Sequence, residues 1–192
     1  MSQFRGTDLK RLHRGWKRTY PEPLGLILES VASPWNVGAL VRTAAAMGID
    51  HLYLVGDTAT PRSPKTQKTA LGTDRYLKWT TYDDIAAAIA AARADGYYIV
   101  ALELASESKP LHTLDLDRPV AILSGHEDRG VTPAALAAAD AVGFVPQVGR
   151  VGSLNVATAT SIAIYEARRQ HWAKLSTPPV FGDHGDESAP EV

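Results

Sequence analysis

The sequence contains no cysteine, and this absence excludes three kinds of protein at once. A disulfide-bonded scaffold, a thiolate nucleophile and a zinc site with cysteine ligands all require thiol groups. Long apolar runs are absent too: no stretch approaches the roughly 20 residues that span a bilayer, and the N-terminus has no apolar segment typical of a secretory signal. We therefore expect a cytoplasmic protein that does not insert into a membrane.

The sequence also lacks an excess of charge of either sign, because its formal net charge is only −1. The charges are nevertheless unevenly distributed: residues 1–20 carry +5, residues 176–192 carry −4, and the segment between them is nearly neutral. A length of 192 residues suits one well-buried domain. We therefore predict a basic arm over residues 1–20, a single catalytic domain over residues 21–175 and a disordered acidic tail over residues 176–192.

The basic arm has the spacing of a helix over residues 3–19. Arg11, Arg14 and Arg18 lie three and four residues apart, which puts them on one helical face. A second, apolar stripe is formed by Leu9, Leu12 and Trp16. The pattern favours a helix that binds RNA, and it also fits a helix that packs on the rest of the protein.

From residue 24 onward, short apolar runs alternate with segments of helical spacing. The predicted strands are residues 24–28, 51–55, 75–79, 97–104, 119–125 and 141–146. The predicted helices are residues 36–48, 83–96, 132–140 and 154–172. We expect Asn36 to cap the first of them and Gly48 to end it, and Thr132 to cap the third. Residues 57–74 are expected to form a loop with at most one helical turn. Such alternation, with continuous apolar strands, predicts an α/β domain whose mostly parallel sheet is flanked by helices.

Three loops that follow predicted strands concentrate glycine and polar residues, at positions 29–48, 124–130 and 146–170. Because the C-terminal ends of parallel strands share one edge of the sheet, all three loops should open on the side where such sheets bind ligands. This predicts one ligand site built from three separate segments.

Side chains in the first two loops suit ligand binding, and each also has a purely structural interpretation. Arg42, six residues after Asn36, suits a phosphate clamp and equally a solvated helix face. Gly125 permits close backbone approach to a ligand, and Glu127 supplies a carboxylate at the strand end. A solvated turn has the same composition, so neither loop identifies a reaction.

The third loop is rich in glycine and runs into the last predicted helix. Its backbone N–H groups suit an anion or a carboxylate, whereas Ser153 or Asn155 also suits the cap of that helix. The residues that define the loop are Gly149, Gly152, Ser153, Leu154 and Asn155. Residue chemistry alone therefore predicts a ligand site and not the reaction performed there.

Taken together and in order, the loops resemble the three motifs of the SPOUT superfamily of RNA methyltransferases, in its SpoU/TrmH branch. The first is NVGALVRTA (36–44), the second is SGHEDRG (124–130), and the third is VPQVGRVGSLNVATATSIAIYEARRQ (145–170). The resemblance covers roughly residues 24–172, and the third motif is similar to that of tRNA guanosine 2'-O-methyltransferases. The sequence departs from the common motif forms at Ser124, Val145, Gln147 and Ala157, which leaves the polar motif positions unchanged.

The resemblance implies a fold, a cofactor and a reaction. The fold is a parallel α/β sheet whose C-terminal segment forms a trefoil knot, and the protein is a homodimer with its site at the dimer interface. The cofactor is S-adenosylmethionine, held in the knot, and the reaction is methylation of a ribose 2'-hydroxyl of RNA. We expect tRNA as substrate, with ribosomal RNA as the alternative.

The resemblance also implies roles for individual residues. Arg42 would hold the phosphate of the target nucleotide and stabilise developing alkoxide charge, with Asn36 orienting it or the ribose. The implied catalytic residues are Arg42, Asn36, Glu127, Ser153 and Asn155. The implied cofactor-binding residues, which act mainly through backbone groups, are Leu102, Ser124, Gly125, Val145, Pro146, Ser153 and Leu154. The expected RNA-binding residues are Arg42 and, in the basic arm, Arg11, Arg14 and Arg18. No metal site is implied.

Two other classes of protein can be compared with the sequence. A nicotinamide-dependent oxidoreductase would need a Gly-x-Gly-x-x-Gly turn after the first strand, and none follows residues 24–28. A non-catalytic RNA-binding member of the same fold would be expected to lose the arginine or the Ser-Leu-Asn loop, and this chain keeps both.

Overall fold

The structure, a computed structural model, describes residues 6–18 and 22–175. The chain divides into two compact units. The described part of the first contains helix α1 (Gly6–Arg18) and residues 172–175, and in it the rings of Trp16 and Trp172 have centroids 5.2 Å apart. The second contains residues 22–171. The tail predicted for residues 176–192 lies outside the described residues.

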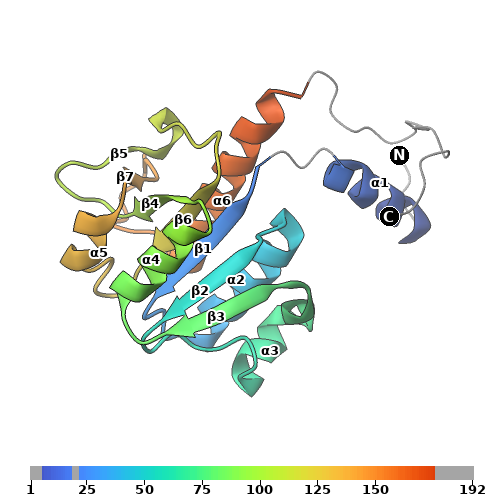
Figure 1. The fold of residues 1–192 in the computed structure, drawn as a ribbon, viewed down its shortest axis with the longest axis horizontal. Helices are drawn as coiled ribbons and strands as arrows, with labels where there is room; N and C mark the ends of the chain where they lie inside the picture. The colour runs from blue at the N-terminus through green and yellow to red at the C-terminus, as the bar shows by residue number, and fades with distance from the viewer. Residues whose placement is uncertain (1–5, 19–21, 176–192) are drawn as a thin grey trace. The chain divides into compact units, whose positions relative to one another are not determined.

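The second unit is built on a seven-stranded sheet in the order β3-β2-β1-β6-β4-β7-β5, in which every neighbouring pair is parallel (Figure 1). The strands are β1 (Leu24–Glu29), β2 (His51–Val55), β3 (Lys78–Tyr82), β4 (Tyr98–Leu102), β5 (Lys109–Pro110), β6 (Val120–Ser124) and β7 (Ala141–Phe144). All residues of β1, β2 and β6 are buried, as expected for strands covered on both faces. The predicted α/β class with a parallel sheet is confirmed.

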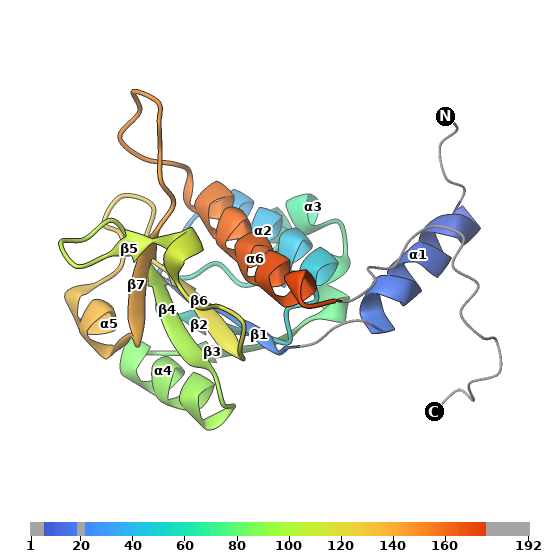
Figure 2. The ribbon, with the colours of Figure 1, turned by 90° about the horizontal axis from the view of Figure 1, so that it is seen from above.

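Helices cover both faces of this sheet (Figure 2). One face carries α2 (Pro34–Met47), α3 (Pro64–Ala70) and α6 (Val156–Ala173), and the other carries α4 (Ile85–Ala94) and α5 (Pro133–Ala138). Two short 3-10 turns, η1 (Thr73–Tyr76) and η2 (Leu111–Thr113), complete the described elements. The side chains of successive β1 residues pack on opposite faces of the sheet. Leu26 and Leu28 belong to the apolar cluster under α2 and α6, and Ile27 belongs to the cluster under α4.

The predicted start of the first catalytic-domain helix is wrong by two residues. The N-cap is Ser33, whose hydroxyl accepts a hydrogen bond from the N–H of Asn36, and Pro34 takes the first helical position. Asn36 is therefore inside the first turn, and its side chain is available for contacts with other loops. The other two predicted helix ends are confirmed: Gly48 ends α2 with a φ of 66°, and Thr132 caps α5.

The segment predicted as a loop, residues 57–74, contains α3 and the start of η1. Ser63 caps α3 and Pro64 begins it, and these two residues start the helix. The helix is too short to show the amphipathic pattern from which a helix is predicted. The strand predicted over residues 75–79 lies at Lys78–Tyr82 instead, because η1 occupies the preceding residues. The two-residue strand β5 was not predicted, since so short a run has no periodicity.

A buried arginine connects α6 with the C-terminal end of α2. Arg168 is only 1% exposed, and its guanidinium donates hydrogen bonds to the carbonyl groups of Met47 (2.9 Å), Gly48 (2.6 Å) and Glu22 (2.7 Å). A cation at this position also complements the negative end of the α2 dipole. Helix α6 is thereby fixed to the segment that precedes β1 and to the C-terminal end of α2.

The histidine beside this arginine is held in its neutral form. His171 Nδ1 lies 3.2 Å from the guanidinium of Arg168 and can only accept, so Nε2 carries the proton and donates to the carbonyl of Leu116 at 2.9 Å. Burial lowers the pKa of His171 below its ordinary value of 6.5, and the charge of Arg168 lowers it further, against the raising effect of the bond to Leu116.

The protein should lose stability as the pH falls below about 6.5, because His171 binds a proton more readily in the unfolded chain, where its pKa is ordinary, than in the folded protein, where its pKa is lower. The folded pKa is the lower of the two, so the contribution is complete above the unfolded value and decreases as the pH falls toward the folded one. His171→Gln keeps a donor for Leu116 and an acceptor for Arg168, and should flatten this dependence between roughly pH 6.5 and 5. Urea unfolding across this pH range measures the slope, and a variant with the wild-type slope would contradict the assignment.

Candidate active site

The strand order brings two of the predicted loops together at one edge of the sheet. From β1 the chain proceeds to β2 and β3 on one side, whereas β6 and β4 lie on the other side of β1. Because β1 and β6 are parallel neighbours, the loops that follow them lie side by side at the C-terminal edge, which is where parallel α/β sheets bind ligands. The predicted first and second loops meet at this point.

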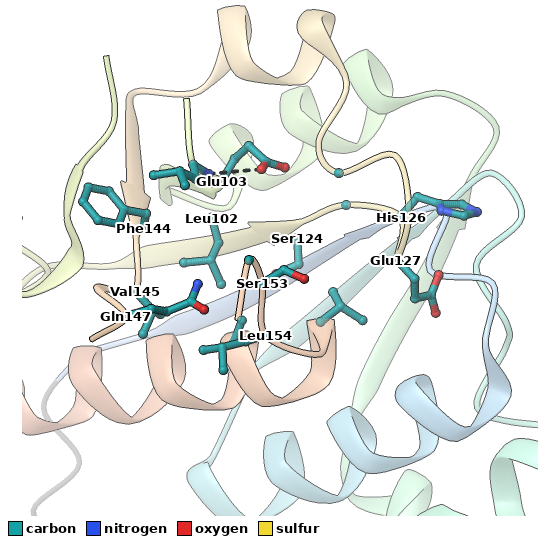
Figure 3. A pocket seen from close by; sticks show the side chains of 16 residues that line it. Leu102, Glu103, Ser124, His126, Glu127, Phe144, Val145, Gln147, Ser153 and Leu154 are labelled. Carbon is teal, nitrogen blue, oxygen red and sulfur yellow. Dashed lines mark hydrogen bonds between the residues drawn. The ribbon is translucent and has the colours of Figure 1, made fainter. Parts of the chain in front are cut away.

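A cavity of about 200 Å³ opens at this edge (Figure 3). It lies beyond the ends of β4, β6 and β7, and Figure 3 shows side chains from these strands and from the loop before α6 converging on it. The predicted cofactor-binding residues that line it are Leu102, Ser124, Gly125, Val145, Ser153 and Leu154. Pro146 is not among the lining residues, although its neighbours Val145 and Gln147 are.

The walls of the cavity combine apolar and polar side chains, and two of the polar ones, Ser124 and Glu103, are held by hydrogen bonds within the protein. The hydroxyl of Ser124 is buried and lies 2.7 Å from that of Thr160 on α6. Glu103, directly after β4, also lines the cavity and was missed by sequence reasoning. Its carboxylate accepts the N–H of Val131 at 2.8 Å and that of Leu104 at 3.1 Å. One charged residue after an apolar strand carries no distinctive signal.

The glycines of the second loop are required by the loop itself. A Cβ at Gly125 would overlap the backbone of Gly130, and one at Gly130, where φ is 67°, would overlap the carboxylate of Glu103. His126 and Gly130 exchange two backbone hydrogen bonds, of 3.1 and 2.9 Å. The close approach expected at Gly125 is therefore one between two parts of the same loop.

Glu127 joins the second loop to the first. One carboxylate oxygen accepts the N–H of Ser33 at 3.0 Å and the side-chain amide of Asn36 at 2.9 Å, and the other accepts the N–H of Ala32 at 3.3 Å. Burial alone would raise the pKa of Glu127, but the hydrogen bonds from Asn36 and from the backbone outweigh it and hold the pKa below its ordinary value. The side chain is an anion that orders the start of α2.

Asn155 extends this network to the third loop. Its amide N–H donates to Asn36 Oδ1 at 3.0 Å, and its Oδ1 accepts the N–H groups of Ala157 (2.9 Å) and Thr158 (3.2 Å). Asn155 therefore caps α6 and contacts the first loop at the same time. Glu127, Asn36 and Asn155 form one chain of hydrogen bonds through all three loops.

The structure does not bring Arg42 into the lining of the cavity. Arg42 is exposed on α2, does not line the cavity, and makes no ion pair or hydrogen bond with the part of the chain that the structure describes. Arg11, Arg14 and Arg18 belong to α1, in the other unit. The network residues Asn36 and Asn155 also line an open groove of about 530 Å³ between α2 and α6, together with apolar side chains.

Within residues 6–18 and 22–175, no group of three or more His, Cys, Asp or Glu side chains could hold a metal ion. Among the helices of the same described residues, none combines the length and the apolar character needed to cross a bilayer.

A family model, that of the SpoU rRNA Methylase family, matches residues 23–165. These residues include the whole lining of the cavity and the three residues of the hydrogen-bond network, Asn36, Glu127 and Asn155. The chain belongs to this family. The match confirms the family predicted from the three motifs, since all three begin inside the matched residues.

Curated relatives and solved structures of SpoU methylases agree with this assignment. The chain is 35% identical over 147 residues to the tRNA (guanosine(18)-2'-O)-methyltransferase of Escherichia coli K12, covering 77% of this chain and 63% of the relative. It is 34% identical over 150 residues to the 23S rRNA (guanosine-2'-O-)-methyltransferase RlmB of Acinetobacter baylyi, covering 78% and 60%. The AdoMet-bound rRNA methyltransferase of Sinorhizobium meliloti superposes with a TM-score of 0.73 at 34% identity, over 82% of this chain and 59% of that one. The chain thus spans about six-tenths of the length of these relatives.

Proposed function

We propose that this chain transfers the methyl group of S-adenosylmethionine to a ribose 2'-hydroxyl of RNA. The observation that carries the proposal is the cavity at the C-terminal edge of the sheet, to which the second and third motifs contribute most of the lining residues while the first motif is hydrogen-bonded beside it. The relatives described above are named for this reaction on tRNA and on 23S rRNA, which supports it.

The chemistry of the cavity suits S-adenosylmethionine. Leu102, Val145 and Leu154 provide apolar walls for an adenine ring, and the neighbouring backbone provides donors and acceptors. Two acidic residues, Glu103 and Glu127, are also among those that line the cavity, and their charge favours a ligand with positive charge. When bound, S-adenosylmethionine supplies a methyl group on a sulfonium, which is already a reactive electrophile.

Five residues are proposed to carry the reaction, one by contacting the RNA and four by ordering the loops of the site. Arg42 would bind the phosphate of the target nucleotide and stabilise the developing alkoxide, because a guanidinium offers only N–H donors and no acceptor, and is therefore poorly suited to remove a proton. Glu127, Asn36 and Asn155 would hold the loops in register through their hydrogen-bond network. Ser153, which lines the cavity, would order the third loop around the cofactor.

A trefoil knot is proposed for the C-terminal segment. The chain leaves β7, which lies beyond β4, and returns to pack α6 in the same core as β1 and α2. The connecting segment must therefore cross the ends of β4 and β6. Passage of that segment through the loops there would form the knot that holds the cofactor.

A homodimer is proposed on the groove between α2 and α6. Trp35, Ile162 and Tyr165 line this groove and are 59%, 40% and 51% exposed, an apolar surface of the kind that a second copy covers. Dimerisation would also bring Arg42 of a second copy toward the cavity, from which it is separate within one chain.

Light scattering at micromolar concentration should give the mass of a dimer, and a fully active monomer would contradict this.

The substrate proposed is tRNA, on the basis of the third motif and of the short basic arm. Arg11, Arg14 and Arg18 of α1 would contribute to RNA affinity, and the protein would act in the cytoplasm. The 34% identity to a 23S rRNA methyltransferase supports ribosomal RNA as the alternative substrate.

Methyl transfer can be tested directly with purified protein, S-adenosylmethionine and RNA from cells that lack the protein. Mass spectrometry of the digested RNA should detect a 2'-O-methylated nucleoside that is absent when the cofactor is omitted. S-adenosylmethionine should raise the unfolding temperature and NAD should not. Stabilisation by NAD alone, with no methylated nucleoside, would overturn the proposed function.

A further inference from the structure

A basic surface with an exposed aromatic ring lies on α3 and η1. Between residues 58 and 82 the chain has five Lys or Arg residues and a single acidic residue, Asp74. Five exposed side chains define what we call the α3–η1 surface: Arg62, Lys65, Lys68, Arg75 and Tyr76. Lys65 and Lys68 are three residues apart and share one face of α3.

The cations of this surface lack the carboxylate partners that other surface arginines have. Arg93, Arg118 and Arg169 each form an ion pair, at 2.8, 2.6 and 2.7 Å. Within residues 6–18 and 22–175, none of the four cations of the α3–η1 surface forms one. The surface therefore has positive charge available for an external anion.

Two of the cations lie over aromatic rings instead. The guanidinium carbon of Arg75 is 4.8 Å from the ring centroid of Tyr76, and that of Arg62 is 5.6 Å from the centroid of Trp79. Arg75 also donates a hydrogen bond to the hydroxyl of Tyr76 at 2.8 Å, which fixes the ring. Tyr76 is 66% exposed, so one ring edge or face is open to a further planar group.

This surface lies next to the helix that carries Arg42. α3 packs so closely on α2 that a Cβ at Gly38 would overlap Thr69 and the carbonyl of Thr66 (Figure 1). Arg42 follows Gly38 by four residues, so it lies one turn further along the same side of α2. A ligand that extends over α3 therefore reaches the candidate catalytic arginine without crossing the sheet.

We propose that the α3–η1 surface binds the RNA beside the target nucleotide. Lys65, Lys68 and Arg62 contact phosphates, and Tyr76, backed by Arg75, stacks on an unpaired base. Cations without protein partners together with an exposed aromatic platform are what single-stranded regions of RNA require. This inference rests on the proposed function, and adds to it a binding site outside the three motifs and the basic arm.

The phosphate contacts are tested with Lys65→Ala/Lys68→Ala in the full chain. Binding of a fluorescein-labelled unmodified tRNA transcript, measured by anisotropy between 50 and 300 mM KCl, should be weakened about tenfold at the lower salt. The slope of log Kd against log salt should become shallower by about 1.5, since each phosphate contact contributes about 0.7–0.9. Arg93→Ala/Arg118→Ala removes two arginines that are paired with Asp140 and Asp115, outside the α3–η1 surface, and should bind as the wild type does. Equal affinity and slope for the Lys65/Lys68 variant and the wild type would overturn the proposal.

The stacking contact is tested with Tyr76→Ala and the matched Tyr76→Phe. Loss of the ring should weaken tRNA binding about tenfold, because the stacking of a base on an aromatic ring contributes substantially to the binding of single-stranded nucleic acid. Tyr76→Phe should bind as the wild type does, and neither change should alter the affinity for heparin, which has charge but no bases. Equal weakening for tRNA and heparin would overturn the role of Tyr76.

Failure of this inference can be separated from failure of the proposed function. A wild-type protein that methylates RNA, with variants that bind RNA as it does, would overturn the α3–η1 surface alone. A wild-type protein that binds neither S-adenosylmethionine nor RNA would overturn both. The substituted side chains are all exposed, and alanine favours the helix of α3, so folded variants are expected.

Discussion

Arg42→Ala should lower the rate of methyl transfer about a hundred- to a thousandfold while leaving the affinity for S-adenosylmethionine nearly unchanged. Arg42 projects from α2 and is absent from the lining of the cavity, so its loss removes no wall of the cofactor site. Its guanidinium is free of ion pairs within the described residues, which leaves all of its donors for a phosphate or an alkoxide. The loss should appear in single-turnover rates measured with labelled S-adenosylmethionine, and calorimetry should report unchanged cofactor binding.

Arg42→Lys separates charge from geometry in the same assay. Lysine keeps the positive charge but cannot make the paired hydrogen bonds of a guanidinium, so an intermediate rate is expected. Arg93→Ala, a surface arginine on α4, is the control and should react at the wild-type rate. An unchanged single-turnover rate for Arg42→Ala would refute the catalytic role. Loss of cofactor affinity in that variant would place Arg42 in the cofactor site instead.

The parts of the fold that could be predicted from sequence are those with strong periodicity or a defined cap. The apolar run HLYLV gives β2 with both ends correct, and Gly48 marks the end of α2. The short elements α3, η1 and β5 could not be predicted, because none of them has a continuous apolar run or a helical period and their shape depends on contacts elsewhere. For α3 the decisive contact is with Gly38 of α2, 28 residues earlier than Thr66.

The site shows the same division between local signal and long-range contact. The residue types of the three motifs were visible in the sequence, but the partners of their side chains were not. Asn36 lies 91 residues from Glu127 and 119 from Asn155, and only the fold brings these amides and the carboxylate together. Asn36 could be mistaken for a helix cap because Asn is a good capping residue, and Ser33 three positions earlier supplies the same chemistry. Glu103 could not be found at all, since its role depends on Gly130 in another loop.

Arg168→Ala should produce the largest loss of stability of any single substitution considered, about 3–5 kcal/mol in the free energy of unfolding. The side chain is 1% exposed, and its removal leaves the carbonyl groups of Met47, Gly48 and Glu22 without the donors they now have. It also deprives His171 Nδ1 of its donor and removes a cation from the end of α2. Thermal unfolding should show a midpoint lower by about 10 °C.

The next residue provides the matched control for this prediction. Arg169 is half-exposed and pairs with Glu166 on the same helix, through hydrogen bonds of 2.7 and 2.8 Å. Arg169→Ala removes the same atoms one position away and should leave the unfolding midpoint close to that of the wild type, because exposed pairs within a helix contribute little. The unfolding midpoint of Arg168→Lys should lie between those of the two alanine variants. The ammonium group of a shorter side chain can donate hydrogen bonds to some but not all of the three carbonyl groups. Equal midpoints for Arg168→Ala and Arg169→Ala would show that water satisfies these carbonyl groups and that the arginine does not hold α6 to α2.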